Sequence, residues 1–225
     1  EIILYNSSGR KISQTKIPIE SDIIAMNHAK NGLYVLAGGF LFLRSSDGNV
    51  SKALDENFVT VPVAGSSTRT LMLQSGNFLA INCGHAGMYH LSVCNLESKN
   101  IIFKNIKNAS FRFALWKDSI AYVTGGAGNW EILRADCISK KVRTIFKVSD
   151  LHDIAFAGKY AAIMHEKNNS FCDLETASLY SFPLHFDVKG SADTAFLLAR
   201  ENSTYLVKTE SLFEGLRSLE ECSKK

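Results

Sequence analysis

The chain has 225 residues, 46% of them hydrophobic, and a formal net charge of +3. The apolar content allows a substantial core, whereas so small a charge gives no argument for a nucleic-acid partner. The sequence has no run of eighteen apolar residues and no charged-then-apolar leader, which argues against a membrane-spanning helix and a secretion signal. Because it opens at Glu1, without Met and inside an expected strand, we expect it to be a piece of a longer protein.

The first elements expected along the chain are two strands, residues 2–5 and 11–17, which a Ser-Ser-Gly turn joins. A strand over 22–26 follows, and the turn Asn31-Gly32 leads into a hairpin that opens at Leu33. Asn-Gly between apolar runs is the strongest short hairpin signal. The N-terminal part of the chain is therefore predicted to be built from antiparallel strands.

The hairpin that opens at Leu33 recurs about every forty residues to the end of the chain. The turn residues of its copies are 45, 42, 42 and 34 positions apart: Gly39, Gly84, Gly126, Asn168 and Asn202. A fixed period of roughly 40 residues that contains only strands is typical of the blade of a β-propeller.

We therefore predict an all-β fold, a β-propeller of about six blades, with five or seven blades as alternatives. The whole chain, 1–225, is expected to form one domain, because no stretch between the copies has the composition of a linker. The expected segments are a partial blade at 1–18 and blades at 19–56, 57–107, 108–148, 149–183 and 184–217. Either the partial blade joins the C-terminal strands to close a ring, or the chain is an open or truncated ring.

Residues 211–225 are predicted to form a short helical tail. Apolar residues recur there at helical spacing: Leu212, Phe213, Leu216 and Leu219. Ser211 is expected to cap this helix together with Glu214, three residues further on, as in a capping box. An outer strand that ends in a short helix is the alternative.

The second half of the repeat carries a family resemblance. Residues 130–145, with Asp136 between a strand and a turn, resemble the second half of a WD40 repeat, where the Asp of a Trp-Asp pair stands. Asp173 occupies the same place in the next copy, and Leu151-His152 is similar to the Gly-His start of a WD40 blade. The resemblance spans nearly the whole chain as a pattern, although no copy has both Gly-His and Trp-Asp. It implies a WD40-like β-propeller.

The cysteines and the glycosylation sequons point to different compartments. The cysteines are odd in number, widely spaced and mostly within apolar strands, which indicates buried free thiols: Cys83, Cys94, Cys137, Cys172 and Cys222. This favours an intracellular location. Five Asn-x-Ser/Thr sequons leave secretion open, at Asn6, Asn49, Asn108, Asn168 and Asn202.

Two histidines, His85 and His165, fall in equivalent hairpin turns and are the candidates for a metal site or an acid–base pair. No third ligand stands at the matching position of another copy, apart from Glu166 beside His165. We therefore predict that both are solvated turn residues. His152 is expected to bond an inner-strand hydroxyl or carboxylate, which is a structural role. No metal, cofactor or catalytic residue is predicted.

Two further patterns receive structural interpretations. The segment Gly125-Gly-Ala-Gly128 is predicted to form a tight turn, as is Gly38-Gly39, because a phosphate loop needs a helix after its glycines. Basic residues of the outer strands are predicted to protect sheet edges: Lys104, Lys107, Lys140, Lys141, Arg143 and Lys147. A positive strip that binds phosphates is the alternative. No Gly-x-Ser-x-Gly motif is present, although an active site assembled from several blades stays open.

The two tryptophans are expected in exposed loops. Trp130 begins a strand beside the rim of the hairpin turns, where large aromatic residues anchor protein partners. Packing between blades is the alternative for Trp130, and it is the favoured interpretation for Trp116.

We therefore predict a non-catalytic scaffold that binds a protein or peptide partner on this rim, within a larger complex. The expected contact residues are His85, Met88, Asn129, Trp130, His165, Asn168 and Arg200. The alternatives are a propeller enzyme or small-ligand binder at the channel mouth, and an RNA- or phosphate-binding propeller.

Overall fold

The computed structural model describes residues 1–5, 7–18, 23–29, 31–59, 69–85, 88–126, 128–182, 185–192 and 194–223. The chain divides into two compact units, Glu1–Phe111 and Arg112–Lys225. The expectation of one domain over the whole chain stays a prediction. Some predicted features lie outside the described residues: Asn6, the first residue of the strand predicted over 22–26, Ala127 of the predicted glycine turn and the last two residues of the tail 211–225. The predictions for the side chains of His85 and Cys222 also lie outside what the structure describes.

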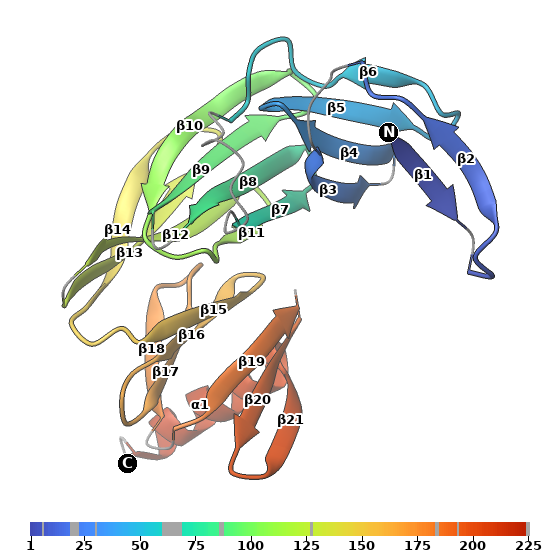
Figure 1. Cartoon of the computed structure of the whole chain (residues 1–225). Coiled ribbons are helices and arrows are strands. Elements are labelled where there is room, and N and C mark those ends of the chain that lie inside the picture. The colour runs from blue at the N-terminus through green and yellow to red at the C-terminus, as the bar shows by residue number, and fades with distance from the viewer. Residues whose placement is uncertain are drawn as a thin grey trace. The chain divides into compact units, whose positions relative to one another are not determined.

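The described part of the first unit contains three antiparallel sheets (Figure 1). The first sheet has two strands, β1 (Ile2–Tyr5) and β2 (Lys11–Thr15). The second has β3 (Ile23–Ala29), β4 (Gly32–Ala37), β5 (Phe40–Ser45) and β6 (Val50–Lys52). The third has β7 (Arg69–Ser75), β8 (Phe78–His85), β9 (Met88–Asn95) and β10 (Asn100–Asn108).

The described part of the second unit also contains three antiparallel sheets. One has β11 (Ala114–Trp116), β12 (Ser119–Gly126), β13 (Asn129–Asp136) and β14 (Val142–Val148). The next has β15 (Asp153–Ala157), β16 (Tyr160–Met164), β17 (Asn169–Asp173) and β18 (Ser178–Phe182). The last has β19 (Asp187–Ala192), β20 (Ala195–Arg200) and β21 (Ser203–Lys208), and the helix α1 (Thr209–Ser223) follows it.

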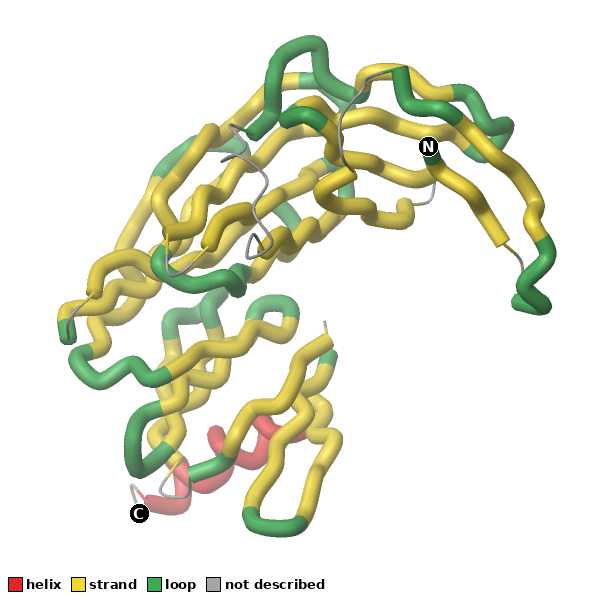
Figure 2. Tube along the Cα trace, in the orientation of Figure 1, coloured by secondary structure: helices red, strands yellow, loops and turns green. Residues whose placement is uncertain are grey.

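Strands make up nearly all the regular structure, and the single helix among the described residues lies at the C-terminus (Figure 2). The predictions of an all-β fold and of a C-terminal helix are therefore confirmed. The helix begins at Thr209, so the prediction that Ser211 caps it is wrong. The chain passes from β21 into α1 without a turn, and the backbone N–H and the hydroxyl of Thr209 both donate to the carbonyl oxygen of Thr194.

Each four-stranded sheet follows chain order, and its strands are called a to d. The a–b and c–d turns then lie at one end of the sheet, and the b–c turn and the connection to the next sheet lie at the other. At the first end of three of these sheets, those of β7–β10, β11–β14 and β15–β18, the residue after strand c donates its backbone N–H to a carbonyl oxygen of the a–b turn. The pairs are Leu96 to Asn77 at 2.7 Å, Cys137 to Asp118 at 2.7 Å and Leu174 to Lys159 at 2.9 Å, and Thr209 to Thr194 at 2.9 Å is their counterpart in the last sheet.

The last residue of strand c carries a short polar side chain in three sheets. The Oδ1 atoms of Asn95, Asp136 and Asp173 accept the backbone N–H groups two and three residues further on. Such bonds fix the first half of the turn. These turns close with Lys99, Lys140 and Ala177 at φ of 56°, 57° and 59°. Asp136 and Asp173, which carry the WD40 resemblance, therefore act as turn caps.

Each unit has a core made from the inner faces of its sheets. In the first unit, Leu36, Leu41, Leu79 and Ile81 belong to one buried cluster of β4, β5 and β8. In the second unit, α1 contributes Phe213 and Leu216 to a cluster with β15–β17, β19 and β20. The helical spacing seen in the sequence therefore marks the buried face of α1.

The buried residues confirm one sequence interpretation and correct another. Cys83, Cys94, Cys137 and Cys172 are buried free thiols, as predicted. Trp116 ends β11 and is only 8% exposed, so its expected place in an exposed loop is wrong, whereas the favoured interpretation of a packing residue is confirmed. Among the described residues, no helix has the length and the apolar content that crossing a membrane requires.

Candidate functional site

The predicted contact residues lie at the b–c end of the sheets but belong to both units. His85 and Met88 are in the first unit, where they pair as the last residue of β8 and the first of β9, and Met88 is 62% exposed. The other five are in the second unit: Asn129, Trp130, His165, Asn168 and Arg200. The rim of the second unit is defined here as residues 128–130, 149–152, 165–168, 185–186 and 200–202.

His165 is held at this rim by both nitrogens of its ring. Nδ1 lies 2.6 Å from the carbonyl oxygen of Asp150, and Nε2 lies 3.1 Å from Oγ of Ser170. A carbonyl oxygen only accepts, so Nδ1 carries the proton. The backbone N–H of His165 also donates to the carbonyl oxygen of Asn168 and closes the b–c turn. His165 is therefore a structural residue of the turn, with no ring nitrogen left for a metal.

Metal and acid–base chemistry finds no support elsewhere in the described residues. They contain no group of three His, Cys, Asp or Glu side chains that could hold a metal ion. His152 is exposed, and its backbone N–H donates to the carbonyl oxygen of Met164. The side-chain bond expected for His152 is not formed with any described residue.

Asn169 directly follows the rim segment 165–168, and its bonding partner is what the sequence did not reveal. Its side chain is fully buried; Nδ2 donates to the carbonyl oxygen of Phe186 at 3.1 Å, and Oδ1 accepts the N–H of Phe186 at 2.6 Å. This pair of bonds ties the b–c turn of β16 and β17 to the segment that enters β19. A polar residue at the start of an apolar strand is the only signal for it, and that signal does not name the partner.

A contact between Phe186 and Arg200 joins two further segments of the rim. The Arg200 guanidinium lies 5.9 Å from the centroid of the Phe186 ring, which suits a cation–π contact. Its Nε also lies 3.7 Å from the carboxylate of the neighbouring Glu201. Arg200 is exposed, so its contacts orient the side chain without removing it from solvent.

Trp130 stands at the start of β13, next to a glycine turn. It pairs with Gly125 on one side and with Val148 on the other, and it is half-buried. A Cβ atom on Gly126 would lie 4.0 Å from Cη2 of Trp130, so the indole ring lies beside this glycine. Gly125 and Gly128 have φ of 98° and 82°, the positive values expected of glycines in the predicted turn. Asn129, in the same turn, is exposed.

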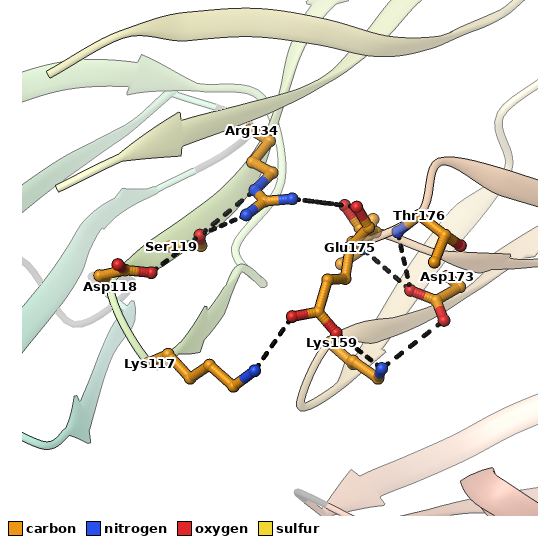
Figure 3. Close-up of polar contacts among 9 residues, drawn as sticks. Lys117, Asp118, Ser119, Arg134, Lys159, Asp173, Glu175 and Thr176 are labelled. Atoms are coloured by element: carbon orange, nitrogen blue, oxygen red, sulfur yellow. Dashed lines mark hydrogen bonds and ion pairs between the residues drawn. The ribbon is translucent and has the colours of Figure 1, made fainter. Parts of the chain in front are cut away.

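The other end of the second unit carries a cluster of charged side chains (Figure 3). Lys159 donates to Glu175 at 2.7 Å and lies 3.8 Å from Asp173, while Lys117 reaches Glu175 from the sheet of β11–β14 at 3.1 Å. The hydrogen bonds from Lys159 and then Lys117 lower the pKa of Glu175 to about 2. The same bond to Glu175 raises the pKa of Lys159. All of these charges are paired, so the cluster joins two sheets.

No protein-family model and no curated protein sequence matches the chain. Solved structures do match. A structure from work on two prolyl endopeptidases shares 10% identity, covers 83% of this chain and 35% of its own, and has a TM-score of 0.52. Oligopeptidase B from Leishmania major shares 11% identity. That match covers 84% of this chain and 32% of the oligopeptidase, with a TM-score of 0.50. The β-propeller domain of the trilobed protease from Pyrococcus furiosus shares 12% identity. That match covers 64% of this chain and 58% of the protease domain, with a TM-score of 0.41.

The fold is a β-propeller. Two observations support the β-propeller class: the antiparallel sheets of up to four strands, and the likeness to the two peptidase structures. The chain spans about a third of the length of those two peptidases, 35% and 32%, and 58% of the trilobed protease domain. At such identities the likeness shows the fold and no activity.

Proposed function

We propose that this β-propeller is a non-catalytic, WD40-like scaffold that binds a protein or peptide partner through the rim of its second unit. Asn129, Trp130, His165, Asn168 and Arg200 form the contact surface there, and His85 and Met88 form its counterpart in the first unit. The partner belongs to a larger intracellular complex.

The bonds that hold His165 carry this proposal. The histidine fixes its own turn to Asp150, and the adjacent Asn169 fixes that turn to Phe186. Three loops of the rim are thus ordered before any partner arrives. A preordered surface loses little conformational entropy on binding, which is what favours a binding platform.

Trp130 is the proposed anchor of this surface. It is large, half-buried and set beside glycine backbone, so part of its ring is open to a partner while the rest is held. Aromatic side chains of this kind dominate the binding energy of many interfaces. The polar side chains of Asn129 and Asn168 are exposed on the same rim and supply hydrogen-bonding groups around the anchor.

The turn caps support the finer assignment to a WD40-like propeller. Asp136 and Asp173 end strand c and bond the next turn in the way that a repeated structural Asp requires. Asn95 does the same in the first unit, which extends the pattern to a repeat whose sequence shows no Asp.

The test compares wild-type protein, Trp130→Ala and Ile138→Ala as baits in an affinity capture from cell lysate. Ile138 is a matched control, because it is 70% exposed at the opposite end of the same sheet. Loss of Trp130 is expected to weaken a specific partner by about 2 kcal/mol or more, as for an interface hot spot. Proteins that Ile138→Ala retains and Trp130→Ala loses are the expected partners.

A thermal melt of each bait separates binding from folding. If Trp130 is a packing residue, its loss costs about 3–5 kcal/mol of stability, as for other buried aromatic residues. Reduced stability together with unchanged recovery of every captured protein would contradict the proposal.

A further inference from the structure

A basic cleft lies at the c–d end of the sheet of β11–β14, on β13, β14 and the turn between them. Its volume is about 490 Å³, and its lining residues are Arg134, Asp136, Ser139, Lys141, Val142 and Arg143. Arg134 and Arg143 are directly opposite each other in the pairing of β13 with β14. Side chains that are opposite, or two residues apart along a strand, project from the same face. Both arginines, Asp136 and Lys141 therefore share one face.

The charges of this face do not balance. Three cationic side chains meet one carboxylate, and neither Lys141 nor Arg143 forms an ion pair with a described residue. Oδ1 of Asp136 is already occupied, since it accepts the N–H groups of Ile138 and Ser139 at 3.1 and 2.6 Å. Like charges opposite each other destabilise a pair of strands, so an anion in the cleft would relieve a repulsion.

Arg134 is fixed in place by partners that carry no charge. Its Nε and Nη2 donate to Oγ of Ser119 at 3.2 and 2.9 Å, and its Nη1 donates to the carbonyl oxygen of Glu175 at 3.1 Å (Figure 3). The guanidinium also lies 5.5 Å from the ring centroid of Trp116. These contacts orient the group and leave its positive charge uncompensated, which is how a preformed anion site is built.

We propose that this cleft binds a phosphate monoester. The net charge of +2 on the lining side chains complements the charge of nearly −2 that a phosphate monoester carries at pH 7. The fork of Arg143 matches a pair of phosphate oxygens, and Arg134 and Lys141 add positive charge. The volume lies within the range of small-ligand sites, so it admits the phosphate together with the group that carries it.

This site is independent of the rim at Trp130, because it lies at the other end of the sheet. Four of the basic residues that the sequence indicated take no part in it: Lys104 pairs with Glu56, Lys147 pairs with Glu131, and neither Lys107 nor Lys140 lines the cleft. Two of the predicted edge-protecting residues, Lys141 and Arg143, are joined here by Arg134, which the sequence did not single out.

The test is calorimetric titration of the full chain with O-phosphoserine, with inorganic phosphate and with a short single-stranded RNA, at about 0.15 M salt. Arg143→Gln is expected to weaken phosphoserine binding about tenfold or more, and Arg143→Lys is expected to weaken it less, because it keeps the charge and loses the fork. The matched control is Lys167→Gln, an exposed lysine of the rim, which removes the same charge far from the cleft. This control is expected to change the affinity less than about twofold, because exposed charges at a distance are screened by salt.

The ligands distinguish the source of the phosphate. Tighter binding of phosphoserine than of inorganic phosphate assigns the site to a phosphorylated side chain, and equal binding assigns it to the free anion. Three results would each overturn the proposal of a monoester site. They are the absence of heat with both phosphoserine and inorganic phosphate, a loss of phosphoserine affinity in Lys167→Gln equal to that in Arg143→Gln, and tighter binding of the RNA than of phosphoserine.

Discussion

The ring of Phe213 in α1 stacks on the ring of Tyr160 in β16, with centroids 4.2 Å apart and an interplanar angle of 28°. Phe213 also meets Phe171 and Tyr180 edge to face, at 6.4 and 5.7 Å. The helix is thus part of the core of the second unit, where it covers the sheet of β15–β18.

Removal of this ring tests the role of the helix. Phe213 is fully buried, so Phe213→Ala is expected to lower the free energy of unfolding of the second unit by about 3–5 kcal/mol. Leu219→Ala on the same helix is the control, because Leu219 is 65% exposed and its loss should cost less than about 0.5 kcal/mol. Urea unfolding followed by far-ultraviolet circular dichroism gives both values, and equal values would contradict a core role for α1.

The cap of the turn after β17 can be tested at Asp173. Its Oδ1 accepts the N–H groups of Glu175 and Thr176 at 2.9 and 3.2 Å, and the side chain is buried. Asp173→Ala leaves both donors without this acceptor and should cost about 1–3 kcal/mol of unfolding free energy. Asp173→Asn keeps the acceptor, as Asn95 does at the matching position, and should cost less. Chemical denaturation of both variants is the measurement, and equal losses would show that the cap is unimportant.

The lowered pKa of Glu175 predicts a dependence of stability on pH. The folded value of about 2 lies below the ordinary value of 4.5 because Lys159 and Lys117 bond the carboxylate. The stabilisation is therefore complete above pH 4.5 and is lost as the pH falls toward 2. Since Glu175 and its two lysine partners are partly exposed, this stabilisation should stay below about 1 kcal/mol.

Urea unfolding at about pH 6 and about pH 3 measures this contribution. Glu175→Gln should show a smaller loss of stability between the two pH values than the wild type does. Glu166→Gln, an exposed control on the rim, should keep the wild-type difference. An unchanged difference in Glu175→Gln would mean that the cluster does not couple folding to pH.

The buried thiols should react slowly in the folded protein. Burial raises the pKa of Cys94 and of Cys137 to about 12, and it raises that of Cys172 as well. A thiolate is the reactive form, so native labelling with iodoacetamide should be slow at these residues and at the buried Cys83, and rapid in urea. Mass mapping of labelled peptides checks this, and rapid labelling of any of the four before unfolding would contradict it.

The sequence predicted the sheets because their signals are local. Asn31-Gly32, Gly38-Gly39 and the forty-residue recurrence depend on the turn chemistry of the chain near each strand, and the strands follow in order. The position of the helix was predicted for the same reason, since Leu212, Phe213 and Leu216 mark one face. Its first residue was missed, because the bond from Thr209 to Thr194 joins residues fifteen positions apart.

The contacts between sheets could not be predicted from one sequence. Arg134 reads as the polar residue of an alternating strand, and nothing near it indicates that Ser119 and the carbonyl of Glu175 hold its guanidinium. The same holds for the bonds between Asn169 and Phe186. Glu175 and Phe186 lie outside the sheets that carry Arg134 and Asn169, respectively, so these contacts form only once neighbouring sheets pack together.

The bonds from Leu96 to Asn77, from Cys137 to Asp118 and from Leu174 to Lys159 use main-chain atoms alone. Every amino acid except proline can supply that N–H, and every amino acid can supply that carbonyl oxygen. Side chains at these positions are thus free to drift over evolutionary time while the ends of these three sheets stay closed. A repeat fastened in this way can lose its sequence signature long before it loses its shape, so related blades are better recognised by geometry than by residue identity.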